Sequence, residues 1–466
     1  SVTQSVTVSV TTTPPPNQNG LERSGRWFTY GGQPTYFVGQ DLQQIVADPE
    51  VDYMSTLDQL QTYHINKVRI WIDAYWKPDA YLHPWERVDG RYDLDSWNSA
   101  YWQKLREFVA AAAAREIVIE VSIFDVYPGR IRWWADSSMR VAWNKDFNVN
   151  GVFSTNEYGN FYPQFFDLSY SERSTSGKTI KDYQQALVDK TLQEIGSYPN
   201  VFFEIANEFP GTFSDVDCSP GTCIDQVYQW QQYWADYIRQ QSSRLVTVHA
   251  NDSSGQQTDG VQYFWDQSSV DVLNFHFYSD DPNNISSLLH DAQLKGKILT
   301  ENESYRMEDG DVGRMTREAW AFFLSGGYYG LYQDDVKLVG SSQWLPFAKR
   351  LKALRTVAEA ANFSTFSPVD GGGNEYDSLV SGGPGSDWQV MANPGSTYLA
   401  YFWGTKSSAS AKINLSSGNY SYTWYDARDA AVRGSGSVSG GTNVSITAPS
   451  SSAWDAASGL VLVVKK

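Results

Sequence analysis

A glutamate at the end of a predicted strand is the first residue in this sequence that could do chemistry. The run Val201–Ala206 is mostly apolar and is followed directly by Asn207 and Glu208, then by an aromatic residue and a proline. A carboxyl group placed where a buried strand meets a loop can exchange a proton with a bound substrate. The alternative is an ordinary strand-to-loop transition with a solvated glutamate.

Two further glutamates occur in the segment Gly296–Tyr305, which also reads as a strand. Glu301 and Glu303 are two residues apart, so we expect their side chains on the same face of that strand. One carboxyl group can then serve as a nucleophile, and the other as a neighbour whose charge raises the pKa of the acid. The residues alone leave open which glutamate has which role.

Other polar residues interrupt apolar runs. Arg69 lies between Val68 and Ile70, where a buried guanidinium needs an anionic partner, and a catalytic carboxylate is the obvious one. His276 and Tyr278 alternate with phenylalanines at another predicted strand end, which favours a site over a satisfied core histidine.

These residues need a fold that brings strand ends together. Between residues 25 and 364, short apolar runs alternate with helical patterns, as is typical of parallel strands buried on both faces. Eight such strands with helices between them predict an α/β fold, a (β/α)8 barrel, whose catalytic groups lie at the C-terminal ends of the strands. The predicted strands are Tyr36–Gln40, Lys67–Asp73, Ile117–Phe124, Val201–Ala206, Leu245–Ala250, Val272–Phe277, Lys297–Asn302 and Tyr328–Tyr332.

Three helices are predicted with most support, Trp97–Arg115, Asp182–Ile195 and Pro346–Ala361. The interval 125–180 is rich in Trp, Asn and Gly and is expected to form a long loop on the active-site side.

Composition changes along the chain predict three parts. Residues 1–20 are rich in Ser, Thr and Pro and form a tail or an edge strand. Residues 21–365 form the barrel, and residues 366–466 form a β-sandwich domain. The short strands predicted in that domain are Asp387–Met391, Thr397–Phe402, Ala411–Leu415, Tyr420–Tyr425, Ser435–Ser439, Asn443–Thr447 and Leu460–Val464.

The overall composition excludes several classes of partner. A net charge of −17 argues against nucleic acid and against an anionic membrane surface. The 18 Trp, 29 Tyr and 22 Phe either build a large core or provide faces on which sugar rings stack. With 36 Gly and only 19% charged residues, the composition suits a secreted enzyme, and we expect a monomer.

Cys218 and Cys223 are the only cysteines and flank a Pro/Gly segment. This spacing predicts a small local disulfide, with two free thiols as the alternative. A metal site would need further ligands nearby in the sequence, and we expect neither a metal nor a cofactor.

With Asn207-Glu208 ending the fourth predicted strand and Glu303 ending the seventh, the chain resembles the clan A glycoside hydrolases, which include many cellulases and mannanases. The resemblance implies that Glu208 is the acid/base and that Asn207 binds the 2-hydroxyl of the substrate. The spacing in that clan, counted from Lys297, favours Glu303 over Glu301 as the nucleophile.

The resemblance also suggests roles for residues elsewhere in the barrel. Arg69 would lie near the nucleophile, and the Tyr278 hydroxyl would bond to it, with His276 nearby. Asp41 would bind a sugar hydroxyl or cap a helix. Trp143 and Asn144 would reach the cleft.

Together these features predict a retaining glycoside hydrolase that cleaves β-glycosidic bonds of a neutral polysaccharide or oligosaccharide by double displacement. Three alternatives remain: an exo-acting glycosidase, a non-catalytic carbohydrate-binding barrel, and a scaffold in which the C-terminal domain is the active part. The eighth predicted strand lacks the tryptophan that many clan members carry, which leaves the sugar open.

Overall fold

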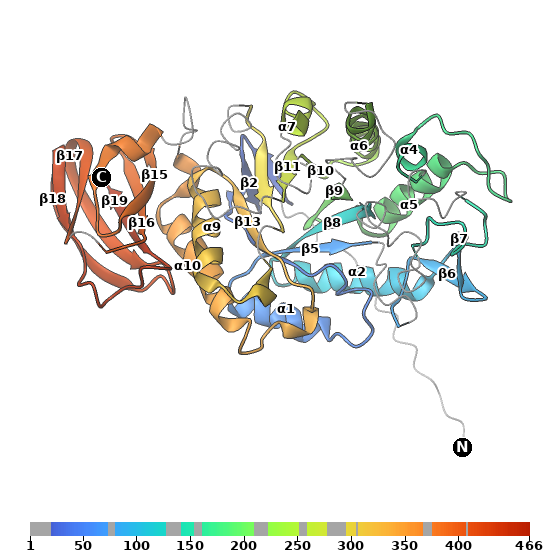
Figure 1. The fold of residues 1–466 in the computed structure, drawn as a ribbon, viewed down its shortest axis with the longest axis horizontal. Coiled ribbons are helices and arrows are strands. Elements are labelled where there is room, and N and C mark those ends of the chain that lie inside the picture. The colour runs from blue at the N-terminus through green and yellow to red at the C-terminus, as the bar shows by residue number, and fades with distance from the viewer. Residues whose placement is uncertain are drawn as a thin grey trace, which may run out of the picture.

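The computed structural model of the chain describes residues 20–72, 80–126, 141–152, 161–208, 222–250, 259–276, 295–303, 306–366, 375–406 and 409–466. A larger α/β unit and a smaller all-β unit lie side by side (Figure 1). Among the described residues, no helix is both long and apolar enough to cross a membrane.

The α/β unit is built on a closed barrel of parallel strands, as the sequence predicts. Each predicted strand overlaps one observed strand, although several end one or two residues earlier than expected. Around the barrel the strand order is β10-β11-β12-β13-β4-β5-β8-β9, so β5 and β12 are separated by β13 and β4. The barrel strands are β4 (Val38–Asp41), β5 (Lys67–Trp71), β8 (Val118–Asp125), β9 (Val201–Asn207), β10 (Val246–His249), β11 (Val272–Phe275), β12 (Ile298–Glu301) and β13 (Tyr328–Leu331).

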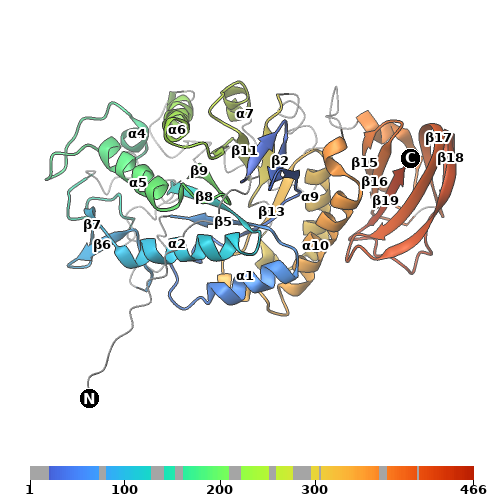
Figure 2. The same cartoon turned by 180° about the vertical axis from the view of Figure 1, so that it is seen from behind.

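Helices surround these strands, with α1 and α2 on one side and α6 and α7 on the other (Figures 1 and 2). The three helices predicted from the sequence are confirmed as α2, α5 and α10. Local capping explains where some helices begin: Thr179 and Asp182 form a capping box at the start of α5. The helices are α1 (Tyr53–Thr62), α2 (Ser99–Ala113), α4 (Phe161–Phe166), α5 (Ile180–Ile195), α6 (Thr222–Gln241), α7 (Asp259–Phe264), α9 (Val312–Leu324) and α10 (Leu345–Ala360).

A small antiparallel sheet packs at the N-terminal end of the barrel. It consists of β1 (Glu22–Ser24), β2 (Trp27–Tyr30) and β3 (Gln33–Pro34). Phe28 packs on Phe202 and Tyr328, with ring centroids 5.6 and 4.9 Å away. Its backbone N–H also donates to the Tyr328 hydroxyl at 2.9 Å. These contacts fill one end of the barrel, so a substrate must approach from the opposite end, where the strands terminate.

The C-terminal unit is all-β, as predicted. Its strands form one antiparallel sheet in the order β14-β17-β19-β16-β15, with β18 paired to β17. Four of the predicted short strands are wrong as separate elements, because they merge in pairs into the long strands β17 and β18, whose pairing continues through irregular positions. The strands are β14 (Val380–Gly382), β15 (Asp387–Asn393), β16 (Thr397–Trp403), β17 (Ser410–Asp426), β18 (Val432–Thr447) and β19 (Leu460–Lys465).

Alternation along β16 shows how the two units are joined. Tyr398 and Phe402 belong to the core of the β unit itself, whereas Leu399 and Tyr401 belong to the core that includes the barrel. Tyr401 stacks on Trp320 of α9, with ring centroids 5.3 Å apart. The sheet therefore braces α9 through a shared apolar interface.

Candidate active site

Arg69 lies at the centre of a cluster formed by the C-terminal ends of the barrel strands. Its side chain is fully buried, and Nη1 donates to Asp41 Oδ2 at 2.5 Å and to Glu303 Oε1 at 2.6 Å. Nε donates to Glu204 Oε2 at 2.8 Å, and Nη2 donates to Asn207 Oδ1 at 2.7 Å. Because β5 and β12 are not neighbours, the contact between Arg69 and Glu303 crosses the barrel interior. The anionic partner predicted for Arg69 is thus a group of three carboxylates.

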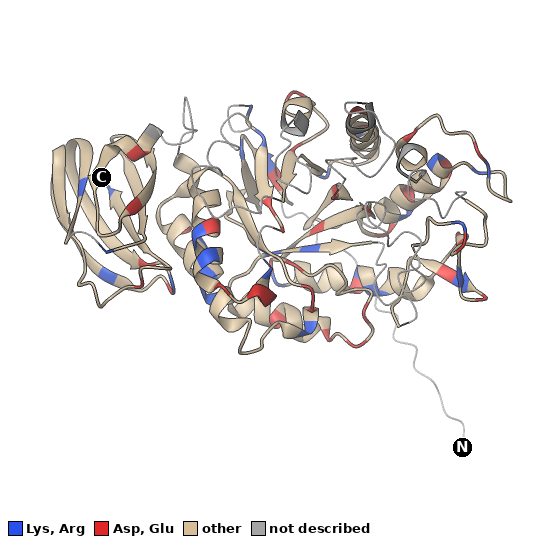
Figure 3. Ribbon diagram, in the orientation of Figure 1, with Lys and Arg blue, Asp and Glu red and all other residues tan. Residues whose placement is uncertain are grey.

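A second buried cation lies deeper in the barrel. Lys67 Nζ is 2.5 Å from Glu120 Oε2 and 2.6 Å from Asn302 Oδ1. Asn302 Nδ2 also donates to Glu120 Oε2 at 3.0 Å. Figure 3 shows that acidic and basic positions occur on the barrel strands as well as on the outer helices. These contacts link β5, β8 and the end of β12 through the barrel interior.

The backbone turns Glu208 toward this cluster. Asn207 is the last residue of β9, and continued alternation would point the next side chain away from the interior. Glu208 instead adopts φ +31°, a left-handed conformation that is rare for a residue with a large side chain. Its backbone N–H donates to His249 Nδ1 at 3.3 Å. Unusual backbone conformations of this kind concentrate at functional sites.

Glu303 also reaches the interior through a break in alternation. Asn302 contacts Lys67 across the barrel, so Glu301 lies on the other face of β12. The chain bends after Glu301, and the Glu303 N–H donates to Glu301 Oε1 at 2.8 Å. The expectation that Glu301 and Glu303 share one face is therefore wrong. The Glu301 side chain lies on the outer face of the barrel wall and accepts a hydrogen bond from the backbone of Glu303, whose own side chain points into the barrel.

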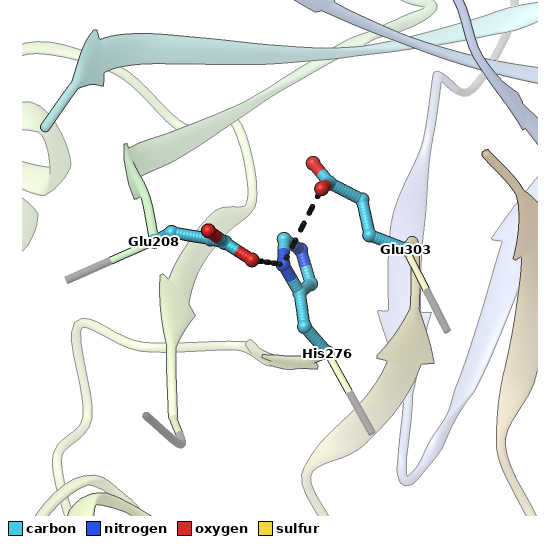
Figure 4. Close-up of side chains that lie close together, drawn as sticks. All are labelled: Glu208, His276 and Glu303. Atoms are coloured by element: carbon cyan, nitrogen blue, oxygen red, sulfur yellow. Dashed lines mark hydrogen bonds and ion pairs between the residues drawn. The ribbon is translucent and has the colours of Figure 1, made fainter. Parts of the chain in front are cut away.

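His276 lies between the two candidate catalytic glutamates (Figure 4). Its Nδ1 is 3.0 Å from Glu208 Oε1 and 3.7 Å from Glu303 Oε2. One oxygen of each glutamate and one His276 nitrogen all lie within 4.8 Å of one another. Three such groups could hold a metal ion, but the positive charge of Arg69 beside Glu303 opposes a cation there.

The imidazoles near the pair are neutral. Burial lowers the pKa of His276 well below its usual value, and the positive charges of Arg69 and Lys67 lower it further. Burial, followed by the neighbouring His276, likewise lowers the pKa of His249. Burial by itself would lower the pKa of Arg69, but its carboxylate partners raise it well above the usual value, so Arg69 stays charged.

The surroundings of Glu303 have opposing effects on its pKa. Burial raises its pKa well above the usual value, Arg69 opposes this, and the carboxylates of Asp41 and Glu208 reinforce it. The direct contact with Arg69 favours the ionised form of Glu303, whereas Glu208 contacts a neutral imidazole.

The structure places the other predicted site residues as follows. Asn207 and Asp41 join the Arg69 cluster, and Asp52, not Asp41, caps the first helix. Asn207 Nδ2 donates to Asp125 Oδ1 at 3.1 Å. The positions of Tyr278 and Cys218, and the side chain of Cys223, lie outside the described residues.

The expectation that Trp143 and Asn144 reach the cleft is wrong. Trp143 is 1% exposed and packs edge-on against Trp85 and Phe165, with ring centroids 5.3 and 5.6 Å away. Asn144 is fully buried and accepts a hydrogen bond from the backbone N–H of Asp146 at 3.0 Å. The aromatic cluster binds this loop to the barrel, so Trp143 serves packing.

Several buried polar residues of the site were missed as site residues, among them Glu204, Lys67 and Glu120. Glu204 accepts a hydrogen bond from Asn274 Nδ2 at 2.6 Å as well as from Arg69. A charged residue inside the apolar run Val201–Ala206 was the signal, and it is the same signal that identified Arg69.

Asp41 gives a prediction about pH. Burial raises its pKa from 3.8 to about 6, with Arg69 opposing the shift. Because the folded pKa is above the unfolded one, the native state binds more protons in this window, and its stability falls as pH rises from about 4 to about 6. We therefore expect the wild type to lose stability relative to Asp41→Asn across that window, by at most about 1.4 kcal/mol per pH unit. Urea denaturation of both proteins at several pH values measures this difference, and a difference that does not change with pH would contradict it.

Comparisons with known proteins agree with this architecture. The sequence matches no family model and no curated protein. A glycoside hydrolase family 5 structure from Bacteroides vulgatus is 16% identical, with a TM-score of 0.65 over 96% of this chain and 93% of that one. A second glycoside hydrolase structure is 12% identical, with a TM-score of 0.64 over 96% and 97%. An endo-1,4-beta-mannanase from Rhizomucor miehei is 14% identical, with a TM-score of 0.52 over 73% and 99%. At these identities the chain shares their fold, and the first two structures cover both of its units.

Proposed function

We propose that this chain is a retaining glycoside hydrolase that cleaves β-glycosidic bonds within a neutral polysaccharide or oligosaccharide. The observation that carries the proposal is the closeness of the two glutamates, because one carboxylate oxygen of Glu208 lies within 4.8 Å of one carboxylate oxygen of Glu303. Retaining enzymes hold their two carboxyl groups about 5–5.5 Å apart, whereas inverting enzymes need about 6.5–9.5 Å to admit a water molecule. The spacing therefore favours a covalent intermediate over direct attack by water.

In the first step, a Glu303 oxygen forms a bond to the anomeric carbon while the bond from that carbon to the leaving oxygen breaks. Glu208 gives its proton to the leaving oxygen. The guanidinium of Arg69 favours the ionised form of Glu303 and fixes its position before the attack. No cofactor or metal takes part in this scheme.

In the second step, Glu208 is ionised and accepts a proton from water, whose oxygen attacks the anomeric carbon. The bond to Glu303 breaks, and the sugar leaves with its original anomeric configuration. Neutral His276 lies beside both carboxyl groups and can exchange hydrogen bonds with either as their charges alternate.

Several features support a neutral carbohydrate as the substrate. The solved structures that share this fold bear the names of glycoside hydrolases, among them an endo-1,4-beta-mannanase. The net charge of −17 disfavours a polyanionic substrate. Secretion and a monomeric state remain predictions from the composition.

Exo-acting hydrolysis is the nearest alternative, and the pattern of products distinguishes it from endo-acting hydrolysis. An endo-acting enzyme releases a range of oligosaccharides early, whereas an exo-acting enzyme releases one small sugar throughout.

A non-catalytic carbohydrate-binding barrel is disfavoured, because both strand-end glutamates are present and their carboxyl groups lie close together. A scaffold whose active part is the β unit would bind its partner without hydrolysing any polysaccharide.

The Glu208→Ala variant tests the role of the acid. We expect its kcat/KM on a polysaccharide to fall by about a hundred- to ten-thousand-fold, because the leaving sugar oxygen needs a proton. With an aryl glycoside whose phenol leaves without protonation, the first step should be nearly as fast as in the wild type, giving a burst of phenol followed by slow turnover. Stopped-flow absorbance measures the burst. Equal losses on both substrates in the first step would exclude Glu208 as the acid.

A further inference from the structure

The peptide group that joins Asn207 to Glu208 is held from both sides. Its carbonyl oxygen, on Asn207, accepts a hydrogen bond from the backbone N–H of Val126 at 3.4 Å, on the β8 side. Its N–H, on Glu208, donates to His249 Nδ1 at 3.3 Å, on the β10 side. The plane of this peptide group is therefore fixed immediately before the candidate acid.

The His249 side chain takes the place that the backbone of a neighbouring strand would have. The parallel pairing of β9 with β10 extends only to Glu204 and Thr247. The Glu208 N–H lies four residues beyond this pairing, and the imidazole of His249, the last residue of β10, is its acceptor. A buried N–H that loses its acceptor is costly, so this contact stabilises one particular orientation of the peptide group.

The imidazole of His249 is itself held in place. On α6, the Gln231 side chain donates from Nε2 to the His249 carbonyl at 3.2 Å and accepts the His249 N–H through Oε1 at 3.0 Å. The ring packs edge-on against that of His276, with centroids 4.3 Å apart. Because Nδ1 accepts the Glu208 N–H, the neutral ring carries its proton on Nε2. His249 thus presents a fixed acceptor to the backbone of Glu208.

The direction of the Glu208 side chain depends on this peptide group. With φ at +31°, the carboxyl group turns toward His276, whose Nδ1 is 3.0 Å from Oε1 (Figure 4). A left-handed conformation at such a residue persists only where the surrounding contacts determine it. Once the acceptor at His249 Nδ1 is removed, the peptide group can rotate, φ can return to its ordinary negative range, and the carboxyl group moves away from His276.

We propose that His249 is a positioning residue, whose Nδ1 holds the backbone of Glu208 so that the Glu208 carboxyl group faces the leaving oxygen of the substrate. The inference rests on the proposed function, in which Glu208 is the acid. In this role His249 acts through Glu208 and does not itself exchange a proton with the substrate.

The dependence of the rate on the leaving group tests this role. The probes are the 2,4-dinitrophenyl, 4-nitrophenyl and phenyl β-glycosides of cellobiose and of mannobiose, and kcat/KM reports the step in which the phenol leaves. A displaced acid matters most when the leaving oxygen is basic. We expect His249→Ala to lower kcat/KM by about ten- to a hundredfold on the phenyl glycoside, the scale for a misplaced catalytic group, and by less than about threefold on the dinitrophenyl glycoside.

Asparagine and glutamine at this position show which ring nitrogen matters. The side-chain oxygen of asparagine is as many bonds from Cα as Nδ1 is, whereas the oxygen of glutamine corresponds to Nε2. We expect His249→Asn to keep kcat/KM on the phenyl glycoside within about threefold of the wild type, and His249→Gln to resemble His249→Ala. A residue that only fills space would give the opposite order, because glutamine is closer to histidine in size. This pair also carries the test if His249→Ala does not fold.

Thr247→Val is the matched control on the same strand. Thr247 lies two residues before His249, so its side chain points to the same face of β10, and it is equally buried. Among the described residues, its Oγ1 has no hydrogen-bond partner. We therefore expect Thr247→Val to keep kcat/KM within about twofold of the wild type on every probe.

A loss in His249→Ala that is equal for the three leaving groups would overturn the positioning role, and so would an asparagine variant no more active than the glutamine variant. Either result leaves the assignment of Glu208 standing. Glu208→Ala separates the two proposals. If its own loss of kcat/KM does not grow as the leaving oxygen becomes more basic, the proposed function fails, whatever the His249 variants show.

Discussion

Replacing Glu303 with glutamine should lower kcat on the wild-type substrate by at least about ten-thousand-fold, which is the scale seen when a nucleophile is removed from an enzyme. The amide keeps the size of the side chain and its hydrogen bonding but cannot form the glycosyl-enzyme bond. Retained thermal stability, measured by circular dichroism, would show that the loss is chemical.

Glu301→Gln is the matched control, because the two glutamates are two residues apart and both are buried. Glu301 Oε1 accepts the Glu303 N–H, and a glutamine oxygen can accept the same bond. We expect this variant to keep its activity within about tenfold of the wild type. If Glu301→Gln were inactive and Glu303→Gln active, the two roles would be reversed.

A small added nucleophile offers an independent check of the same role. In Glu303→Ala, azide can enter the space left by the carboxylate and attack the anomeric carbon from that face. The expected product is a glycosyl azide of inverted configuration, which nuclear magnetic resonance identifies. Rescue that yields the retained configuration would mean that azide replaces Glu208 rather than Glu303.

Replacing Arg69 with methionine should have the largest effect on stability. The guanidinium binds Asp41, Glu204 and Glu303 in the barrel interior, and its removal leaves three buried carboxylates without their cation. Removing one partner of a buried ion pair typically costs about 3–5 kcal/mol of unfolding free energy. The loss should be smaller near pH 4, where the carboxyl groups take up protons and no longer need the cation.

Arg355→Met is the control variant with which the stability loss of Arg69→Met is compared. Arg355 pairs with Glu359 one turn along α10, where both side chains are partly exposed to water. Exposed pairs of this type contribute less than about 1 kcal/mol. Urea denaturation at neutral pH gives both values, and a similar small loss for Arg69→Met would mean that the central cluster does not hold the strand ends together.

The sequence predicts the barrel well, because each strand is a short run of apolar residues between recognisable helices. The predicted strands include His276 and Asn302, which lie just beyond the observed ends of β11 and β12, because the polarity of a residue does not show where backbone pairing between strands stops. In the β unit the opposite error occurs. The Ser, Gly and Asn residues at 416–419 look like a turn, yet β17 continues through them because its pairing with β18 tolerates register shifts.

The candidate site is predictable where a residue type is out of place. Arg69 in an apolar strand and Glu208 after a strand both give such a signal. The relation between Glu301 and Glu303 could not be predicted, because it depends on a backbone bend that reverses the side-chain direction. Trp143 was misassigned for a different reason: a tryptophan in a loop can stack on a sugar or on Trp85, and the sequence does not distinguish these partners.

The most direct test of the central claim is to trap the glycosyl-enzyme. The wild type would be incubated with a 2-deoxy-2-fluoro glycoside of its preferred sugar, carrying a good leaving group, and the labelled peptide would be fragmented by mass spectrometry. The account predicts one sugar per chain, attached to Glu303. Attachment to Glu301 or Glu208, or hydrolysis with inversion and no labelled peptide, would contradict it.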